Sequence, residues 1–317
     1  MRSIHTRFRA YQLGSPGSSF SHFADGYFTL IEARLNEING LSVRQEMTAC
    51  GKETIDGLHI TSWDADHCSA SELMEILTDL MPTKIECPGY SPKSENGLKA
   101  FDLIQEYETA KRTSNRPASL KYITPEYISS LTHADAAAFQ DVLYNPIWID
   151  ESCGNNNSTV SLFRKGSFNV LSLGDVESEM ISARLRRDKY LKREVDVMVL
   201  AHHGADNGFT NKKFLQRVEP QLAICSSDYS NQYDHPTDEI RELLHEQGIR
   251  LMTTKTGDVV VHSQGLHDGH CRAINLRANS TEVSSVFEFE SKKKKLLSYN
   301  PDTLRQLYST KPGYRRL

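Results

Sequence analysis

The sequence predicts an α/β protein in which sheets and helices form a layered sandwich. Strand patterns come first, alternating strand and helix patterns follow, and strand patterns return near residue 250. Some of the strand patterns are nearly continuous apolar runs, which is typical of strands buried on both faces. A chain of 317 residues is long enough to bury such a core in one large domain or two modest ones. This order of patterns favours a layered α/β architecture.

The first half of the chain begins with three short strands separated by glycine-containing turns at residues 14–17 and 25–26. A polar segment, residues 33–56, gives no clear pattern. Helical spacing then begins after Ser69 or Ser71, either of which is a candidate N-cap. The predicted strands are residues 8–13, 18–23, 27–32, 57–61 and 84–87, and the predicted helices are residues 69–80 and 97–111.

The second half has clearer strand and helix patterns after residue 158. Pro236 stands where a proline often opens a helix. The predicted helices are residues 135–143, 177–191, 212–218 and 236–247. The predicted strands are residues 196–201 and 222–225, together with two hairpins formed by residues 159–164 with 168–173 and by residues 250–254 with 258–262.

Composition excludes several classes of protein. The net charge of −4 gives no global attraction for nucleic acid. No stretch approaches eighteen apolar residues, so membrane insertion is not expected, and the N-terminus has no apolar signal-peptide core. Six cysteines without a C-x-x-C pair indicate reduced thiols, and we expect a cytoplasmic protein.

Metal-binding residue types follow four of the predicted strands. Histidine and carboxylate groups are the usual nitrogen and oxygen ligands of Zn²⁺ and Mn²⁺. A carboxylate such as Asp175 can bridge two ions about 3.5–4 Å apart, and their shared water would ionise near neutral pH. We therefore expect two divalent ions, zinc or manganese. The candidate ligands are Asp64, Asp66, His67, Asp175, His202, His203 and His235.

Simpler explanations exist for several of these residues. An Asp-rich loop is often a solvated turn, and Asp175 has the residue type of a helix N-cap. His235 could simply precede a helix. Trp63 could line the substrate cleft and stack on a base, or pack against a neighbouring loop. We expect His267 and His270 to lie in a surface loop, and His133 to lie in a helix or turn.

Five short motifs occur in an order that resembles the metallo-β-lactamase superfamily, and most closely the soluble hydrolase domain of ComEC, the bacterial DNA-uptake channel. The resemblance extends over residues 7–262, with residues 33–56 and 88–150 only loosely covered. The motifs are Ser-Trp-Asp-Ala-Asp-His at 62–67, Asn-Asn-Asn-Ser-Thr-Val at 155–160, Gly-Asp at 174–175, His-His-Gly-Ala at 202–205 and His-Pro at 235–236.

The resemblance implies an αββα metallo-β-lactamase sandwich over residues 1–263 with a C-terminal extension over residues 264–317. It implies a metal-dependent hydrolase, a phosphodiesterase or nuclease, in which a metal-bound hydroxide attacks phosphorus in nucleic acid. Asp66, His202 and His203 are the expected catalytic residues, and one of the two histidines would protonate the leaving oxygen. Protein partners are expected, in a bacterial anti-phage or DNA-processing role.

Two departures from the family pattern leave alternatives open. Ser62 stands in place of the first histidine of the loop, and residues 32–34 replace an early D-x-G motif with Glu-Ala-Arg. The chain could therefore be a non-catalytic module in a multiprotein complex. It could also be a metal-dependent peptidase or lactonase. Residues 291–317 hold eight lysines and arginines against one acid, and could contact a nucleic-acid backbone or form a solvated charge run.

Overall fold

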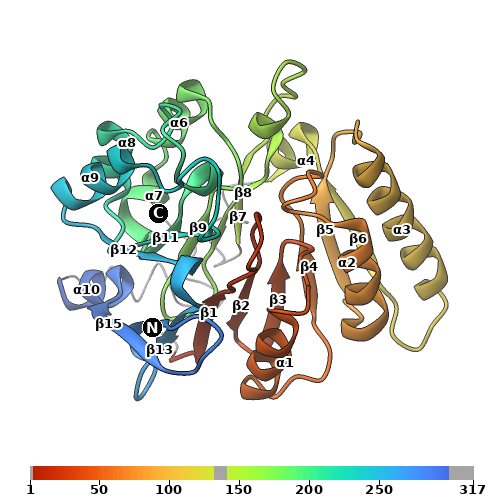
Figure 1. Ribbon diagram of the computed structural model, residues 1–317, viewed down its shortest axis with the longest axis horizontal. Coiled ribbons are helices and arrows are strands. Elements are labelled where there is room, and N and C mark those ends of the chain that lie inside the picture. Colours follow the sequence, from red (N-terminus) through yellow and green to blue (C-terminus); the bar gives the residue numbers. More distant parts are fainter. Residues whose placement is uncertain (1–2, 132–140, 300–317) are drawn as a thin grey trace, which may run out of the picture.

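The computed structural model describes residues 3–131 and 141–299, which form two facing β-sheets with helices on their outer faces (Figure 1). The first sheet contains β1 (Thr6–Ala10), β2 (Phe20–Ala24), β3 (Tyr27–Ile31), β4 (Gly57–His59), β5 (Lys84–Pro88), β6 (Ser119–Ile123), β13 (Val259–Ser263), β14 (His270–Leu276) and β15 (Val283–Glu290). The second contains β7 (Val142–Asn145), β8 (Val160–Phe163), β9 (Val170–Ser172), β10 (Val197–Val199), β11 (Leu222–Cys225) and β12 (Arg250–Thr253).

Among the described residues, the order of the first sheet is β15-β14-β13-β1-β2-β3-β4-β5-β6, and that of the second is β12-β11-β10-β9-β8-β7. We call them the nine-stranded and six-stranded sheets. Strands β9, β10, β11 and β12 run parallel to one another. Their carboxyl ends therefore lie at one edge of the six-stranded sheet, where ligand sites of α/β sheets usually form.

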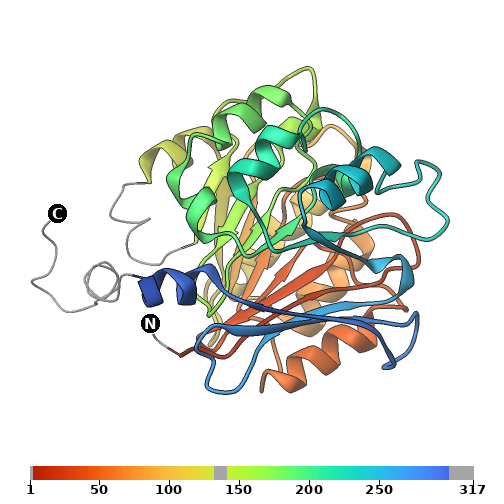
Figure 2. The same ribbon diagram turned by 90° about the vertical axis from the view of Figure 1, so that its left-hand side faces the viewer.

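The helices cover the two outer faces, and Figure 2 shows the layers from the side. The nine-stranded sheet packs against α1 (Gly40–Ala49), α2 (Ala70–Glu75), which continues into a π-helical turn (Ile76–Leu80), and α3 (Glu95–Lys111). The six-stranded sheet packs against α6 (Glu179–Leu185), α7 (Lys189–Glu194), α8 (Lys212–Val218) and α9 (Asp238–Glu246). Apolar side chains from both sheets fill the space between them. These layers confirm the predicted αββα sandwich.

The predicted hairpin of residues 250–262 is wrong, because its two strands belong to different sheets. β12 pairs in parallel with β11, whereas β13 pairs with β1 and β14. A 3₁₀ turn (Thr254–Thr256) and Gly257 connect the sheets. Gly257 has φ 138°, and a Cβ atom there would lie 2.3 Å from the carbonyl oxygen of Leu276. The chain thus passes from the six-stranded sheet to the nine-stranded sheet between β12 and β13.

Two helix predictions and one unassigned segment also differ from the structure. The helix expected over 177–191 is divided into α6 and α7, because Asp188 Oδ1 accepts hydrogen bonds from the Tyr190 and Leu191 amides and begins a new helix. The polar segment 33–56 contains α1. The helix α9 begins after its N-cap Thr237, so Pro236 lies before the helix.

The region 112–157, whose sequence has no clear secondary-structure pattern apart from the helix predicted over 135–143, contains β6, β7 and α4 (Pro125–Ser130). His133 and most of the helix predicted over 135–143 lie outside the described residues. In the described part of the chain, no helix is both long enough and apolar enough to cross a membrane.

The C-terminal extension adds β14 and β15 to one edge of the nine-stranded sheet and then forms α10 (Lys292–Tyr299). The first lysines of the basic tail are bonded to the body of the protein. The Nζ of Lys293 is buried and donates to the carbonyl oxygens of Arg164 and Gly166 at 2.5 and 3.0 Å. The Nζ of Lys292 donates to the carbonyl oxygen of Val218 at 2.7 Å. The tail beyond residue 299 lies outside the described residues.

Candidate metal centre

Loops from both sheets meet at one site. The loop after β4 in the nine-stranded sheet provides Asp66 and His67. The turn after β9 provides Asp175, and a 3₁₀ turn after β10 (Ala201–Gly204) provides His203. The Thr159 amide donates to the Thr61 carbonyl oxygen at 3.0 Å and ties the two sides together.

Gly174 allows these loops to approach closely. It has φ 55°, and an added Cβ atom would lie 2.9 Å from the Cβ of Ser158 and 3.2 Å from the Oγ1 of Thr61. Its carbonyl oxygen accepts a hydrogen bond from the His202 amide at 3.0 Å. The Gly-Asp motif thus holds Asp175 against the loops that bear the other candidate ligands.

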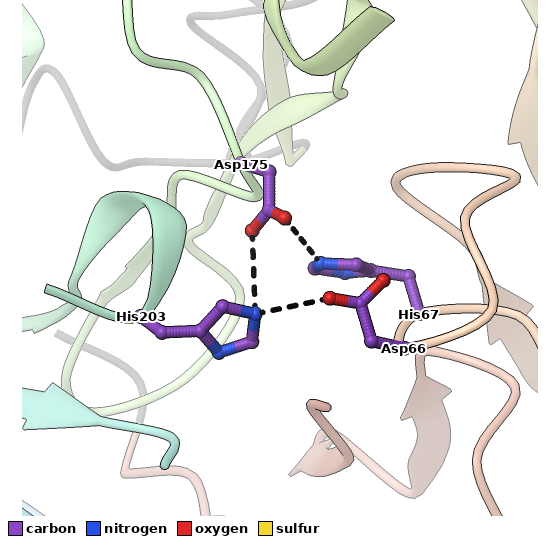
Figure 3. A group of neighbouring side chains, drawn as sticks. All are labelled: Asp66, His67, Asp175 and His203. Carbon is purple, nitrogen blue, oxygen red and sulfur yellow. Dashed lines mark ion pairs between the residues drawn. The ribbon is translucent and has the colours of Figure 1, made fainter. Parts of the chain in front are cut away.

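Four side chains converge on one point, as Figure 3 shows. One ligand-type atom from each of Asp66, His67, Asp175 and His203 lies within 4.8 Å of the others. The Nε2 of His67 is 2.9 Å from Oδ2 of Asp175. The Nε2 of His203 is 3.4 Å from Oδ2 of Asp66 and 3.8 Å from Oδ1 of Asp175. We refer to these four residues as the ligand cluster.

The two histidine rings are oriented by their other nitrogen atoms. The Nδ1 of His67 lies 3.1 Å from Oε1 of the buried Glu32, and the Nδ1 of His203 lies 2.8 Å from the Ser226 carbonyl oxygen. The Nε2 atoms of both rings are buried and face the carboxylates of the ligand cluster. Rings fixed through Nδ1 in this way, with Nε2 directed at carboxylates, are typical of metal-ligating histidines. Two imidazole nitrogens and two carboxylates therefore fit a divalent cation such as Zn²⁺ or Mn²⁺.

The electrostatic field at the cluster favours positive charge. Burial alone would lower the pKa of His67, but the carboxylates of Asp175, Glu32 and Asp66 outweigh it and raise that pKa well above its ordinary value. Burial would raise the pKa of Asp175, but His67 and His203 lower it. A divalent cation would be stabilised by the same carboxylates.

Backbone conformations that non-glycine residues rarely adopt occur around the cluster. Glu32 has φ 68°, His202 has φ 46° and His203 has φ 53°. Each of these conformations costs about 1–3 kcal/mol and persists only where surrounding contacts enforce it. Residues in such conformations gather at functional sites more often than elsewhere.

The other three predicted ligands lie at the margin of the cluster. Asp64 is exposed, and its Oδ2 accepts a hydrogen bond from the Ser62 hydroxyl at 2.8 Å. The Nδ1 of His202 is 3.1 Å from Oε2 of Glu177. The ring of His235 lies nearly parallel to that of His203, with ring centres 6.5 Å apart.

Sequence reasoning missed two carboxylates. Glu32 was considered only as a departure from the D-x-G motif, although it directly follows β3 and so had the position of a site residue. Glu177 contacts His202 and accepts a hydrogen bond from the thiol of Cys153 at 2.8 Å. In the sequence, the only indication that Glu177 belongs to the site is its position two residues after Asp175.

A cavity of about 420 Å³ opens beside the cluster. Its lining residues are Pro16, Gly17, Asp66, His202, His203, Ser227, Asp228, Ser230, Asn231, Gln232, Tyr233 and His235. Trp63 is not among them. It is buried, its Nε1 donates to the Tyr90 carbonyl oxygen at 2.9 Å, and its ring packs against Phe101. Of the two roles considered for Trp63, the packing role is the one the structure supports.

Two proteins with related names resemble this chain in sequence. ComE operon protein 3 of Bacillus subtilis is 27% identical over 214 residues, which make up 66% of this chain and 24% of that protein. Competence protein ComA of Neisseria gonorrhoeae is 31% identical over 126 residues, 39% of this chain and 17% of that protein. The chain thus matches about a quarter or less of the length of either relative. These relatives confirm the resemblance that the motifs indicated.

No known family model matches the chain. Similar solved structures include the metallo-β-lactamase fold protein YhfI from Bacillus subtilis, with a TM-score of 0.46, 12% identity and coverage of 81% of this chain and 99% of that one. The metallo hydrolase Igni18 from Ignicoccus hospitalis has a TM-score of 0.44 at 13% identity and covers 80% of this chain and 98% of that one.

Proposed function

We propose that this chain is a metal-dependent hydrolase that cleaves phosphodiester bonds in nucleic acid. The observation that supports this proposal most directly is the convergence of the buried Nε2 atoms of His67 and His203 with two carboxylates, so that one ligand-type atom from each of the four residues lies within 4.8 Å of the others. The ligand cluster would hold one divalent cation. Nucleic acid is proposed as the substrate because the motifs resemble the hydrolase domain of the ComEC DNA-uptake channel, and because one sequence relative is named Competence protein ComA.

When bound, the cation would provide an activated water at neutral pH and would stabilise negative charge on the substrate. Asp66 and Asp175 would neutralise its charge, while Glu32 and the Ser226 carbonyl oxygen fix the rings that bind it. His202 lines the cavity, and Glu177 lies within ion-pair distance of its Nδ1. We assign His202 the transfer of a proton to the leaving oxygen.

The metal content of the purified protein tests the number of ions. One tightly bound ion per chain is expected from the ligand cluster. Two ions would indicate that Asp64, His202 or His235 completes a second site. A metal-free protein that also fails to bind Zn²⁺ or Mn²⁺ would contradict the proposal and favour the non-catalytic module.

A substitution in the cluster tests the activity. We expect Asp175→Asn to abolish metal binding and cleavage while the far-UV circular dichroism stays that of the wild-type fold. Cleavage is measured on single- and double-stranded DNA and RNA with Mn²⁺ and with Zn²⁺. Asp102→Asn, on the exposed surface of α3, is the matched control and should behave as wild type. Full activity of the Asp175→Asn variant would refute the assignment, and hydrolysis of peptides or lactones alone would change the substrate class.

A further inference from the structure

The loop between β11 and α9 presents two exposed tyrosines, of which Tyr233 lines the cavity beside the ligand cluster. Tyr229 is 77% exposed and Tyr233 is 67% exposed. In the part of the chain whose side chains are described, no other phenylalanine, tyrosine or tryptophan is as exposed. A large aromatic surface left in water next to a cavity is a typical site for binding a planar group.

Tyr233 ends a column of three aromatic rings that begins at the cluster. The His203 and His235 rings are 9° from parallel, with centres 6.5 Å apart. The His235 and Tyr233 rings are 23° from parallel, with centres 5.5 Å apart. The column therefore leads from a cluster residue to a ring at the protein surface.

The wall of the cavity beside this column is polar. Gln232 and Ser230 line it, and these side chains offer both hydrogen-bond donors and acceptors. The side chain of Asn231 also lies there, but it is bonded to the backbone of Asp228 and His235. No lysine or arginine is among the lining residues. The recognition groups beside Tyr233 thus suit the edge of a heterocyclic base better than an extended run of phosphates, which would need cationic partners.

We propose that Tyr233 is a stacking platform for one unpaired base of a single-stranded nucleic-acid substrate, next to the phosphodiester that lies at the ligand cluster. This inference rests on the proposed function and adds the strand type to it. A base in a duplex is stacked on its neighbours and is not free to lie on the tyrosine. A single strand offers such a base without the cost of unpairing.

The test compares two single-stranded DNA oligonucleotides of the same length, one with bases and one with abasic residues at every position. The value of kcat/KM for metal-dependent cleavage is measured for wild-type protein and for the Tyr233→Ala, Tyr233→Phe and Tyr229→Ala variants. Tyr229 is the matched control because it lies on the same loop and is at least as exposed, but is neither in the ring column nor in the cavity lining.

For the strand with bases, Tyr233→Ala should lower kcat/KM by roughly five- to a hundredfold, mainly through KM, as expected for the loss of one stacked base. The abasic strand should be cleaved equally by wild type and Tyr233→Ala. Tyr233→Phe and Tyr229→Ala should match wild type on both strands. If Tyr233→Ala affects both strands equally, or neither, the platform is refuted and the proposed hydrolase remains. If wild type cleaves neither strand but cleaves duplex DNA, the platform is refuted and the proposed hydrolase remains. If wild type cleaves no single- or double-stranded DNA or RNA with any metal, the proposed function fails, and the platform fails with it.

Discussion

Glu32 controls the orientation of His67. Its Oε2 accepts a hydrogen bond from the Thr61 amide at 2.9 Å, and its Oε1 accepts one from the Thr61 hydroxyl. Oε1 also lies 3.1 Å from Nδ1 of His67. All three residues are buried, so these contacts are shielded from water. A carboxylate in this position fixes the tautomer of the histidine and increases the basicity of its Nε2.

We expect Glu32→Gln to weaken metal binding by about 10- to 100-fold without unfolding the protein, because the amide keeps a hydrogen-bonding oxygen but loses the negative charge. Zinc affinity is measured by competition with a chelator. Glu75→Gln, on the exposed face of α2, serves as the control. An unchanged affinity in Glu32→Gln would show that the contact between Glu32 and His67 does not influence the metal.

The adjacent histidines should respond differently to substitution. His203 belongs to the ligand cluster, whereas His202 lies beside Glu177. His203→Ala should lose both bound metal and cleavage, while His202→Ala should keep its metal and lose cleavage, as judged by metal analysis of the same samples. If His202→Ala loses the metal and His203→Ala keeps it, the two roles are exchanged.

The sequence predicted the four cluster residues but could not separate them from their neighbours. Asp64 and Asp66 are of one type and two positions apart, yet only Asp66 belongs to the cluster, because the exposed Asp64 accepts a hydrogen bond from the buried Ser62. His202 and His203 both have left-handed backbone conformations, so alternation along a strand does not decide their directions. The deciding contact for His203 comes from the Ser226 carbonyl oxygen, which is distant in sequence.

At the scale of elements, pairing was the feature that the local sequence could not determine. Residues 250–253 and 259–263 are both strands, as predicted. Their partners are chosen by apolar burial on opposite sheets and by the close approach of Gly257 to the backbone of Leu276. A turn-like stretch between two strands predicts a hairpin only when both strands bury their apolar faces in the same sheet.

For the helix α10, one of the two roles suggested by the sequence was a contact between its lysines and nucleic acid. In the structure, Lys292 and Lys293 bond to the body of the protein instead. The amide of Lys292 donates at 2.7 Å to Asp196, which precedes β10, whereas His203 follows the other end of β10. The start of α10 therefore lies at the opposite end of the strand from the ligand cluster. Lys293, with its two carbonyl partners, acts as a buried link between α10 and the turn after β8.

We expect Lys293→Met to lower the free energy of unfolding by about 1–3 kcal/mol, because two buried carbonyl oxygens lose a charged donor. The affinity for oligonucleotides should not change. Urea unfolding and fluorescence anisotropy measure the two quantities, and Lys99→Met on the exposed face of α3 is the control. Weaker oligonucleotide binding at unchanged stability would restore the nucleic-acid role to this lysine.

At the scale of the whole molecule, the ligand cluster connects the two sheets. Asp66 and His67 come from the loop after a strand of the nine-stranded sheet, and Asp175 and His203 follow strands of the six-stranded sheet. The space between the sheets also contains polar groups away from the cluster. His59 on β4 contacts Ser161 on β8 at 3.0 Å through Nε2 and Glu86 at 3.0 Å through Nδ1. The sheets are therefore joined by polar contacts as well as by apolar packing.

His22 makes this interface sensitive to acid. It is 4% exposed, its ring lies 5.2 Å from that of Phe163 of the facing sheet at a tilt of 36°, and its Nε2 makes no hydrogen bond within the described residues. Burial lowers its pKa from 6.5 to about 4. The folded protein thus keeps His22 neutral in a range where the unfolded chain is protonated. Its contribution to stability is complete above pH 6.5 and is lost as the pH falls from 6.5 towards 4.

Between pH 7.5 and pH 5, this linkage should lower the free energy of unfolding by about 2 kcal/mol in the wild-type protein. In His22→Phe, which keeps an aromatic ring against Phe163 but cannot bind a proton, that part of the loss should disappear. Urea unfolding at the two pH values, in metal-free protein, gives the difference for each variant. His245→Gln, on the exposed surface of α9, should lose as much stability as wild type. The substitution removes His22 from the titration. If His22→Phe and wild type lose the same free energy of unfolding between the two pH values, then other groups cause the acid sensitivity of the protein.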